Sequence, residues 1–179
     1  MIYRFFIAIF VAGLVFVPTD FSHAAEAKLG KITPNGPFRL WTAVNKGLVE
    51  YAFVKGGSAL KANVAALTAV PTTGKKPGHV LAQGAEFRAA LDNGRAKYNL
   101  APSKKYRDPK GRAVTPAVVF LNAGYMLDGL VRLIEAQPNV KDFHVGIIYV
   151  VPKFSGKSPS NVFALAELAT RRMALIAEN

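Results

Sequence analysis

Cysteine is absent from the 179 residues of this chain, and acidic residues are scarce, with 11 Asp and Glu against 23 Lys and Arg. Without cysteine the protein has no disulfide, no zinc–thiolate site and no dithiol redox chemistry. Three histidines are present, one of them within the first 24 residues, so the sequence predicts neither a metal site nor a cofactor. The net charge of +12 is the strongest property that remains, and it indicates an anionic partner.

The first 24 residues have the layout of a secretory signal peptide. Arg4 precedes an apolar run from Phe5 to Val17, Pro18 ends the run, and cleavage is expected after Ala24 or after Ala27. The run has 13 residues, whereas a membrane-spanning helix needs ~20, so a retained anchor is the alternative and we expect no membrane span in the mature chain. Export without cysteine or an Asn-x-Ser/Thr sequon predicts a bacterial periplasmic or secreted protein.

The remainder predicts a connector over residues 25–37 and one domain over residues 38–179. Phe38–Val44 and Leu48–Val54 are β-prone runs on either side of Asn45-Lys46-Gly47, which favours a β-hairpin. A single amphipathic helix over Trp41–Val54 is the alternative, because the apolar residues also fit helical spacing. Two further helices are predicted over Ala59–Val70 and Gln83–Asp92.

The C-terminal part alternates apolar and amphipathic runs. Pro116–Leu121 and His144–Val151 are nearly unbroken apolar stretches, which are typical of strands buried on both faces. Tyr125–Gln137 and Pro159–Ala177 predict helices, the second of which begins with the cap-and-proline pair Ser158-Pro159. This β-α-β-α unit and the N-terminal hairpin predict an α+β fold with a small mixed β-sheet covered by helices. No internal repeat is apparent.

Two short resemblances accompany this pattern. Thr115-Pro116 before a buried strand looks like the proline-containing strand of thioredoxin-fold proteins, which implies a redox-inactive relative because cysteine is absent. Val118–Asn179 resembles the β-α-β-α portion of the OmpA-like peptidoglycan-binding domain. The matching positions are Gly156, Asn161 and Arg171-Arg172. That family's aspartate-containing turn is replaced by Val150-Val151-Pro152-Lys153 and its closing strand is missing, so the chain is assigned to neither family.

Residues 95–112 carry the main functional signal. They hold seven basic residues against the single acid Asp108, which amounts to half of the net charge. Pro102, Pro109 and Gly111 exclude a long helix or a central strand, so we expect an exposed cationic loop. Its tyrosines could stack on a ligand whose phosphates pair with the cations. The candidate binding residues are Arg95, Lys97, Tyr98, Lys104, Lys105, Tyr106, Arg107, Lys110 and Arg112.

We therefore expect a non-catalytic envelope protein that binds an anionic surface or protein partner through this loop, alone or within a larger envelope assembly. Lipid headgroups, lipopolysaccharide, cell-wall polymer and an acidic protein patch all fit, whereas the leader directs the chain away from nucleic acid. The alternative is a small periplasmic enzyme or small-ligand binder. Its pocket would lie near Asp142, His144 and the Gly156–Ser158 loop.

Overall fold

The computed structural model describes residues 32–107, 111, 113–138, 140 and 143–179, and the predicted signal peptide lies outside them. These residues form helices and no strand. The helices are α2 (Asn35–Ala66), α3 (Pro77–Ala96), α4 (Pro116–Glu135), the single turn α5 (Gly146–Tyr149) and α6 (Pro159–Ala177). The expected α+β fold with a mixed sheet is therefore wrong, because the described chain is a helical bundle.

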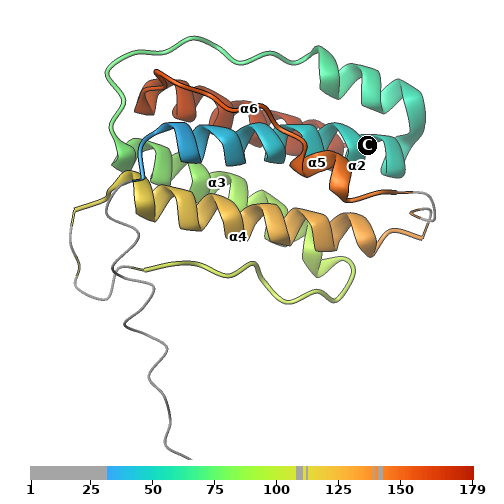
Figure 1. Cartoon of the computed structure of the whole chain (residues 1–179). Helices are drawn as coiled ribbons and strands as arrows, with labels where there is room; N and C mark the ends of the chain where they lie inside the picture. Colours follow the sequence, from blue (N-terminus) through green and yellow to red (C-terminus); the bar gives the residue numbers. More distant parts are fainter. Residues whose placement is uncertain (1–31, 108–110, 112, 139, 141–142) are drawn as a thin grey trace, which may run out of the picture.

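The four long helices run in the same direction. Figure 1 shows α2, α3, α4 and α6 all beginning at one end of the bundle, with extended segments that carry the chain back between them. The first residues of all four helices meet at this end, around Pro34, Pro77, Pro116 and Pro159. We call it the proline end. Both α2 and α3 pack against α4 and α6, so the four helices form a square in which α2 lies diagonally opposite α3.

Proline sets the start of each long helix. Pro77, Pro116 and Pro159 are the first residues of α3, α4 and α6, where a missing N–H costs nothing because it would have no helical partner. Each follows a residue in extended conformation, and a glycine with positive φ lies three to five residues before the proline. These glycines are Gly74 (φ 69°), Gly111 (φ 59°) and Gly156 (φ 65°). Ser158 caps α6 as predicted, since its side chain accepts from the Asn161 N–H.

Counted from these prolines, the helices share one register of buried positions. Residues 3, 7, 10, 14 and 17 after the proline face the core in all four helices, which is the spacing of the core positions of a parallel coiled coil. The five layers are Pro37, Val80, Val119 and Val162; Trp41, Gly84, Ala123 and Ala166; Val44, Phe87, Met126 and Ala169; Leu48, Leu91, Leu130 and Met173; and Tyr51, Gly94, Leu133 and Ile176. All of them are buried except Gly94, which is partly exposed. The chain thus contains a fourfold positional repeat that its amino acids disguise.

Large and small residues complement each other within these layers. Trp41 shares its layer with Gly84, and a Cβ on Gly84 would lie 3.3 Å from Trp41 Cζ2 and 3.3 Å from Met126 Cε. The Trp41 ring also meets Phe87 edge to face at 5.5 Å between ring centroids. Close packing of this kind depends on volume matched across facing positions rather than on any one side chain.

The two predicted C-terminal strands are helix and coil. Pro116–Leu121 forms the first turns of α4, and Tyr125–Gln137, predicted as a separate helix, continues it up to Glu135. The segment His144–Val151 contains the single turn α5 and then runs extended along the bundle, with Ile148 and Val151 buried. A short apolar run fits a buried helix as well as a buried strand, and here the layered packing decides for the helix. Both family resemblances required strands in this part of the chain, so neither resemblance holds.

The predicted N-terminal hairpin is also wrong, and the helical alternative is confirmed. α2 begins at Asn35, inside the expected connector, and runs through Asn45-Lys46-Gly47 without a turn. The buried Asn45 amide explains this, because its nitrogen donates to the carbonyls of Trp41 (2.9 Å) and of Leu165 on α6 (2.8 Å). The break in α2 comes later, at Gly57 (φ 70°, ψ −163°), where only glycine adopts the backbone easily.

By length and composition alone α4 could cross a membrane, which the sequence-based expectation for the mature chain overlooked. In the structure it lies against both α2 and α3, and 56% of its most apolar window is buried. The apolar character of α4 is thus used largely in the core of the bundle.

Replacing Gly84 by Val tests the layered packing. The new side chain would press on Trp41 and Met126, so we expect the free energy of unfolding to fall by ~1–3 kcal/mol. Ala89→Val, at an exposed position of the same helix, is the matched control and should cost less than ~1 kcal/mol. Urea unfolding of both variants measures the difference. Equal stabilities would contradict the layer assignment.

Tyr51 makes the stability of the bundle sensitive to alkaline pH. Burial, followed by the charge of Tyr98, raises the pKa of Tyr51 to about 12 from an ordinary value of 10.0. Between these values the unfolded chain loses the proton while the folded chain keeps it, so stability falls as pH rises. Relative to Tyr51→Phe, we expect a loss of about 2–3 kcal/mol between pH 9 and pH 12 in urea unfolding. If the free energies of unfolding of the two proteins changed in parallel with pH, Tyr51 would not be the cause of the alkaline loss.

Candidate anion-binding surface

The basic stretch follows α3 and runs back along the outside of the bundle toward the proline end (Figure 1). We call residues 97–107 the basic ribbon. It is not a free loop, because three side chains from α3 and one from α4 hold its backbone. These anchors are Arg88, Asp92, Arg95 and Asn122.

Arg95 is the innermost anchor. Its side chain is buried, with the residue 5% exposed, and its guanidinium donates to the Ala101 carbonyl (2.6 Å from Nη2) and to the Gly129 carbonyl of α4 (2.6 Å from Nη1). Asp92 lies 3.8 Å from Arg95 Nε and accepts from the Ser103 N–H at 2.8 Å. Arg95 was predicted to bind a ligand, but its donors are used to fix the start of the ribbon.

Arg88 and Asn122 hold the next part of the ribbon. Arg88 donates to the carbonyls of Ser103 (3.4 Å) and Lys104 and to Asn122 Oδ1 (2.7 Å). The Asn122 amide closes a pair with Tyr106, because Oδ1 accepts from the Tyr106 N–H (3.3 Å) and Nδ2 donates to the Tyr106 carbonyl (3.2 Å). Burial lowers the pKa of Arg88, partly offset by the nearby carboxylate of Asp92. Four side chains thus form hydrogen bonds with backbone groups of a segment that has no regular secondary structure.

The two tyrosines of the ribbon are half-buried. Tyr98 packs against the core and donates from its hydroxyl to Gln137 Oε1 at 2.8 Å. Tyr106 is tied down through its backbone by Asn122. Neither ring stands clear of the bundle, so stacking on a ligand is a weaker feature than the sequence indicated.

Four predicted cations remain exposed on the ribbon: Lys97, Lys104, Lys105 and Arg107. Within the part of the chain that the structure describes, none of them forms an ion pair. Lys110 and Arg112, also predicted to bind, lie outside the described residues. Among the described residues, four of the nine predicted ones are exposed cations on a backbone that side chains hold in place.

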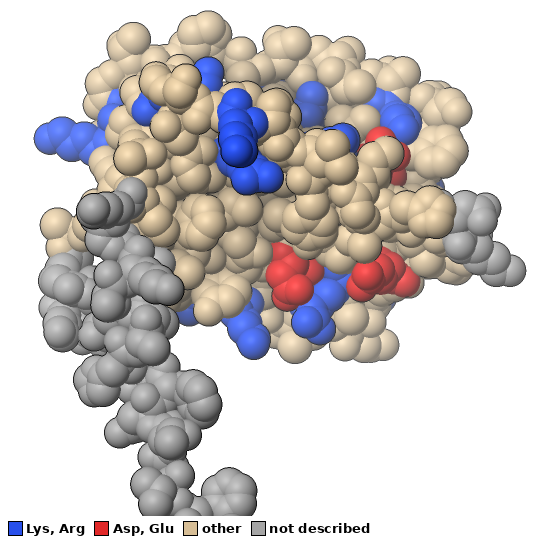
Figure 2. All heavy atoms as spheres, in the orientation of Figure 1, with Lys and Arg blue, Asp and Glu red and all other residues tan. Residues whose placement is uncertain are grey.

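The proline end adds positive potential beside the ribbon. All four helix dipoles point their positive ends there, and the first turn of each helix lacks an acidic residue. Lys75, Lys76 and Lys157 precede the helices, with Lys157 Nζ 4.7 Å from the centre of the Phe38 ring. On the face shown in Figure 2, Lys and Arg side chains are spread widely, whereas Asp and Glu gather at a few places.

The alternative pocket is not assembled. His144 lines a hollow with Gly57, near the break in α2, whereas the Lys157 N–H donates to Asn35 Oδ1 at the start of α2 (2.9 Å). The lining of the hollow begins at Glu50, and the 15 positions of α2 from Asn35 to Glu50 already correspond to ~20 Å of helix. Asp142, the third member, lies outside the described residues. Among the residues described, no group of three His, Asp or Glu could hold a metal ion.

The anchoring roles of the residues that hold the ribbon were not predicted, although two of these residues stand out in the sequence. Asn122 is a lone amide within the apolar run of α4, and Arg88 is the only cation between His79 and Arg95 on α3. A polar residue in an apolar stretch signals a buried hydrogen-bonding role. The partner backbone could not be identified without the fold.

Comparisons with known proteins add no function. No family model, curated protein or solved structure matches this chain. The function therefore has to be inferred from the arrangement of its own residues.

Arg95→Met tests the anchoring of the ribbon. The variant loses hydrogen bonds from a buried charge to two carbonyls, so we expect a loss of ~2–3 kcal/mol in the free energy of unfolding and faster amide exchange at Ser103. Arg132→Met removes an exposed i,i+4 pair with Asp128 and should cost less than ~0.5 kcal/mol. Unchanged exchange at Ser103 would show that Arg95 does not hold the ribbon.

Proposed function

We propose that this is an exported, non-catalytic protein of the bacterial envelope that binds an anionic surface through Lys97, Lys104, Lys105 and Arg107. The observation that carries the proposal is the backbone of the basic ribbon, which side chains hold in place and along which these four cations are exposed. The leader-like first 24 residues support export, and the net charge of +12 supports an anionic partner.

Fixing the ribbon favours binding over a merely solubilising role. A loop that only kept the protein in solution would need no anchors, whereas a binding surface gains affinity when its backbone is ordered in advance. The hydrogen-bonding groups of Asp92, Arg95 and Asn122 are used to hold the backbone of the ribbon in place. The exposed cations are left for an anionic surface.

The recognised chemistry is a dense array of phosphates or carboxylates. Lysine side chains act as point charges that do not demand one geometry, so lipid headgroups, lipopolysaccharide, cell-wall polymer and an acidic protein patch all qualify. The positive ends of four helix dipoles at the neighbouring proline end extend the attractive potential. A surface of this kind binds by charge density, and its affinity falls with salt.

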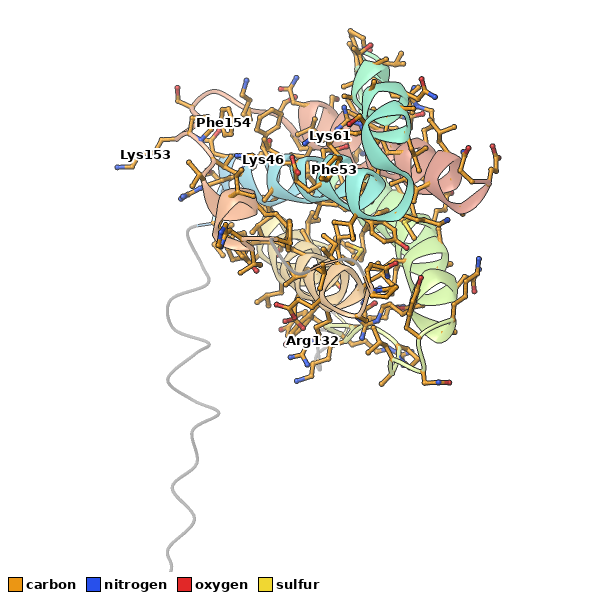
Figure 3. All side chains as sticks on the ribbon, turned by 90° about the vertical axis from the view of Figure 1, so that its right-hand side faces the viewer. Lys46, Phe53, Lys61, Arg132, Lys153 and Phe154 are labelled. Atoms are coloured by element: carbon orange, nitrogen blue, oxygen red, sulfur yellow. The ribbon has the colours of Figure 1, made fainter. Side chains whose placement is uncertain are left out.

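The test compares two variants of equal charge. Replacing Lys104, Lys105 and Arg107 by Ala removes the centre of the ribbon, whereas replacing Arg39, Arg132 and Lys153 by Ala removes three exposed cations elsewhere. Figure 3 shows Lys153 pointing away from the bundle, as a control position should. We expect the ribbon variant to bind phosphatidylglycerol vesicles at least ~10-fold more weakly than the control. The slope of its log affinity against log salt concentration should be smaller in magnitude by about two to three.

Three results would decide against the proposal. Equal binding by the two variants would mean that net charge alone attracts the protein, and equal binding to phosphatidylcholine vesicles would remove the anionic partner. Binding of the wild-type protein that is insensitive to salt would point to a different surface. Soluble polyphosphate, titrated in parallel, separates a polymer partner from a membrane partner.

A further inference from the structure

A groove opens between α3 and α4 beside the basic ribbon. Its volume is about 260 Å³, and the Trp41 side chain of α2 forms part of its wall. The apolar lining comes from Val80, Leu81, Val119 and Met126, and small residues of α3 such as Gly84 and Ala85 leave the space open. The groove reaches the surface at the level of the first three layers, which contain Val80, Trp41 and Met126 respectively.

Trp41, which forms part of the wall of the groove, carries a buried donor without an acceptor. Trp41 is the single tryptophan of the chain and is 1% exposed, yet its indole N–H has no hydrogen-bond partner among the described residues. Cζ2, on the same edge of the indole as Nε1, lies 3.3 Å from where a Gly84 Cβ would be, so this edge faces α3. A buried N–H without a partner is costly. The indole nitrogen is closed to solvent, so a ligand in the groove would meet the wall that Trp41 helps to form and not this N–H.

The charges around the groove are positive. Arg88 and Lys105 line it, Asn122 adds an amide, and none of the described residues that line it is acidic. The hydrogen bonds of Arg88 all go to neutral oxygens, two carbonyls and the Asn122 amide. Burial lowers the pKa of Arg88, which shows that its positive charge is poorly solvated there. An anionic group next to Arg88 and Lys105 would stabilise both.

The size of the groove limits the ligand. At ~30 Å³ for each water-sized group, it holds about nine such groups, which is less than a drug-sized molecule. A lipid with two long acyl chains does not fit. A single chain or small ring with one charged head does.

We propose that this groove binds a small single-chain anionic amphiphile, with its apolar part against Val80, Val119 and Met126 and its anionic head at Arg88 and Lys105. This proposal does not rest on the proposed function, because it needs the groove and not the whole ribbon. The two sites share the cation Lys105, and Arg88, which lines the groove, also anchors the ribbon.

Octanoate is the probe, because its ten non-hydrogen atoms match the groove and it is a monomer at millimolar concentration. We expect saturable binding by calorimetry, together with a change in the emission of Trp41, which reports on this groove alone because no other tryptophan is present. 1-Octanol, which lacks the charge, should bind at least ~10-fold more weakly, and acetate, which lacks the chain, should leave the emission unchanged.

Two variants with a matched control locate the site. Ala85→Leu fills the groove from an exposed position and should abolish the octanoate response, whereas Ala89→Leu, one turn along α3 and outside the groove, should leave it intact. Lys105→Ala should weaken octanoate several-fold without affecting 1-octanol. Both alanines are exposed, so neither change burdens the core.

The proposal is overturned if octanoate leaves Trp41 emission unchanged, or if Ala85→Leu binds octanoate as Ala89→Leu does. The vesicle experiment is separate, because Ala85→Leu keeps every cation of the basic ribbon and should retain vesicle binding. Loss of the octanoate response with vesicle binding intact would confirm two independent sites.

Discussion

The bundle depends on one constraint: four helices start in a common plane and run in the same direction. Because the start of each is fixed by a proline, residues at equal distance from that proline fall in the same layer, and the core is built layer by layer. A large residue in one helix can then be balanced by a small one in another, as Trp41 is by Gly84. The same order places the basic ribbon, since the chain must return along the outside of the bundle before α4 can begin.

Part of this fold could be read from the sequence. Ser158-Pro159 correctly predicted the start of α6, and the alternative of a helix over Trp41–Val54 proved right. The strands failed because Pro116–Leu121 is uniformly apolar, so its local pattern carries no period that separates helix from strand. The repeated register was also missed. Equivalent positions hold Trp, Gly and Ala, which look unrelated until the helices are aligned on their prolines.

The positive charge of the candidate surface could be predicted from the sequence, whereas the ordered backbone that carries it could not. A count of residues suffices to find the cations of 95–112, and Lys97, Lys104, Lys105 and Arg107 are indeed exposed. The count could not separate Arg95 from them, because its role depends on the Gly129 carbonyl, 34 residues away. Nor could it show that Asn122 lies under Tyr106. Electrostatic potential follows from composition, whereas the order of a loop follows from long-range contacts.

The diagonal placement of α2 and α3 bears on how the protein is made. Antiparallel helices close as hairpins while a chain is still emerging, but here α2 and α3 wait for partners further along, and α6 supplies one face to both. Such non-local contacts slow folding relative to other helical proteins. The last residues synthesised complete the core, so the full bundle can close only when translation is nearly finished. For the export proposed above, this order would keep the chain open until it meets a secretion channel, which accepts an extended chain and not a closed bundle.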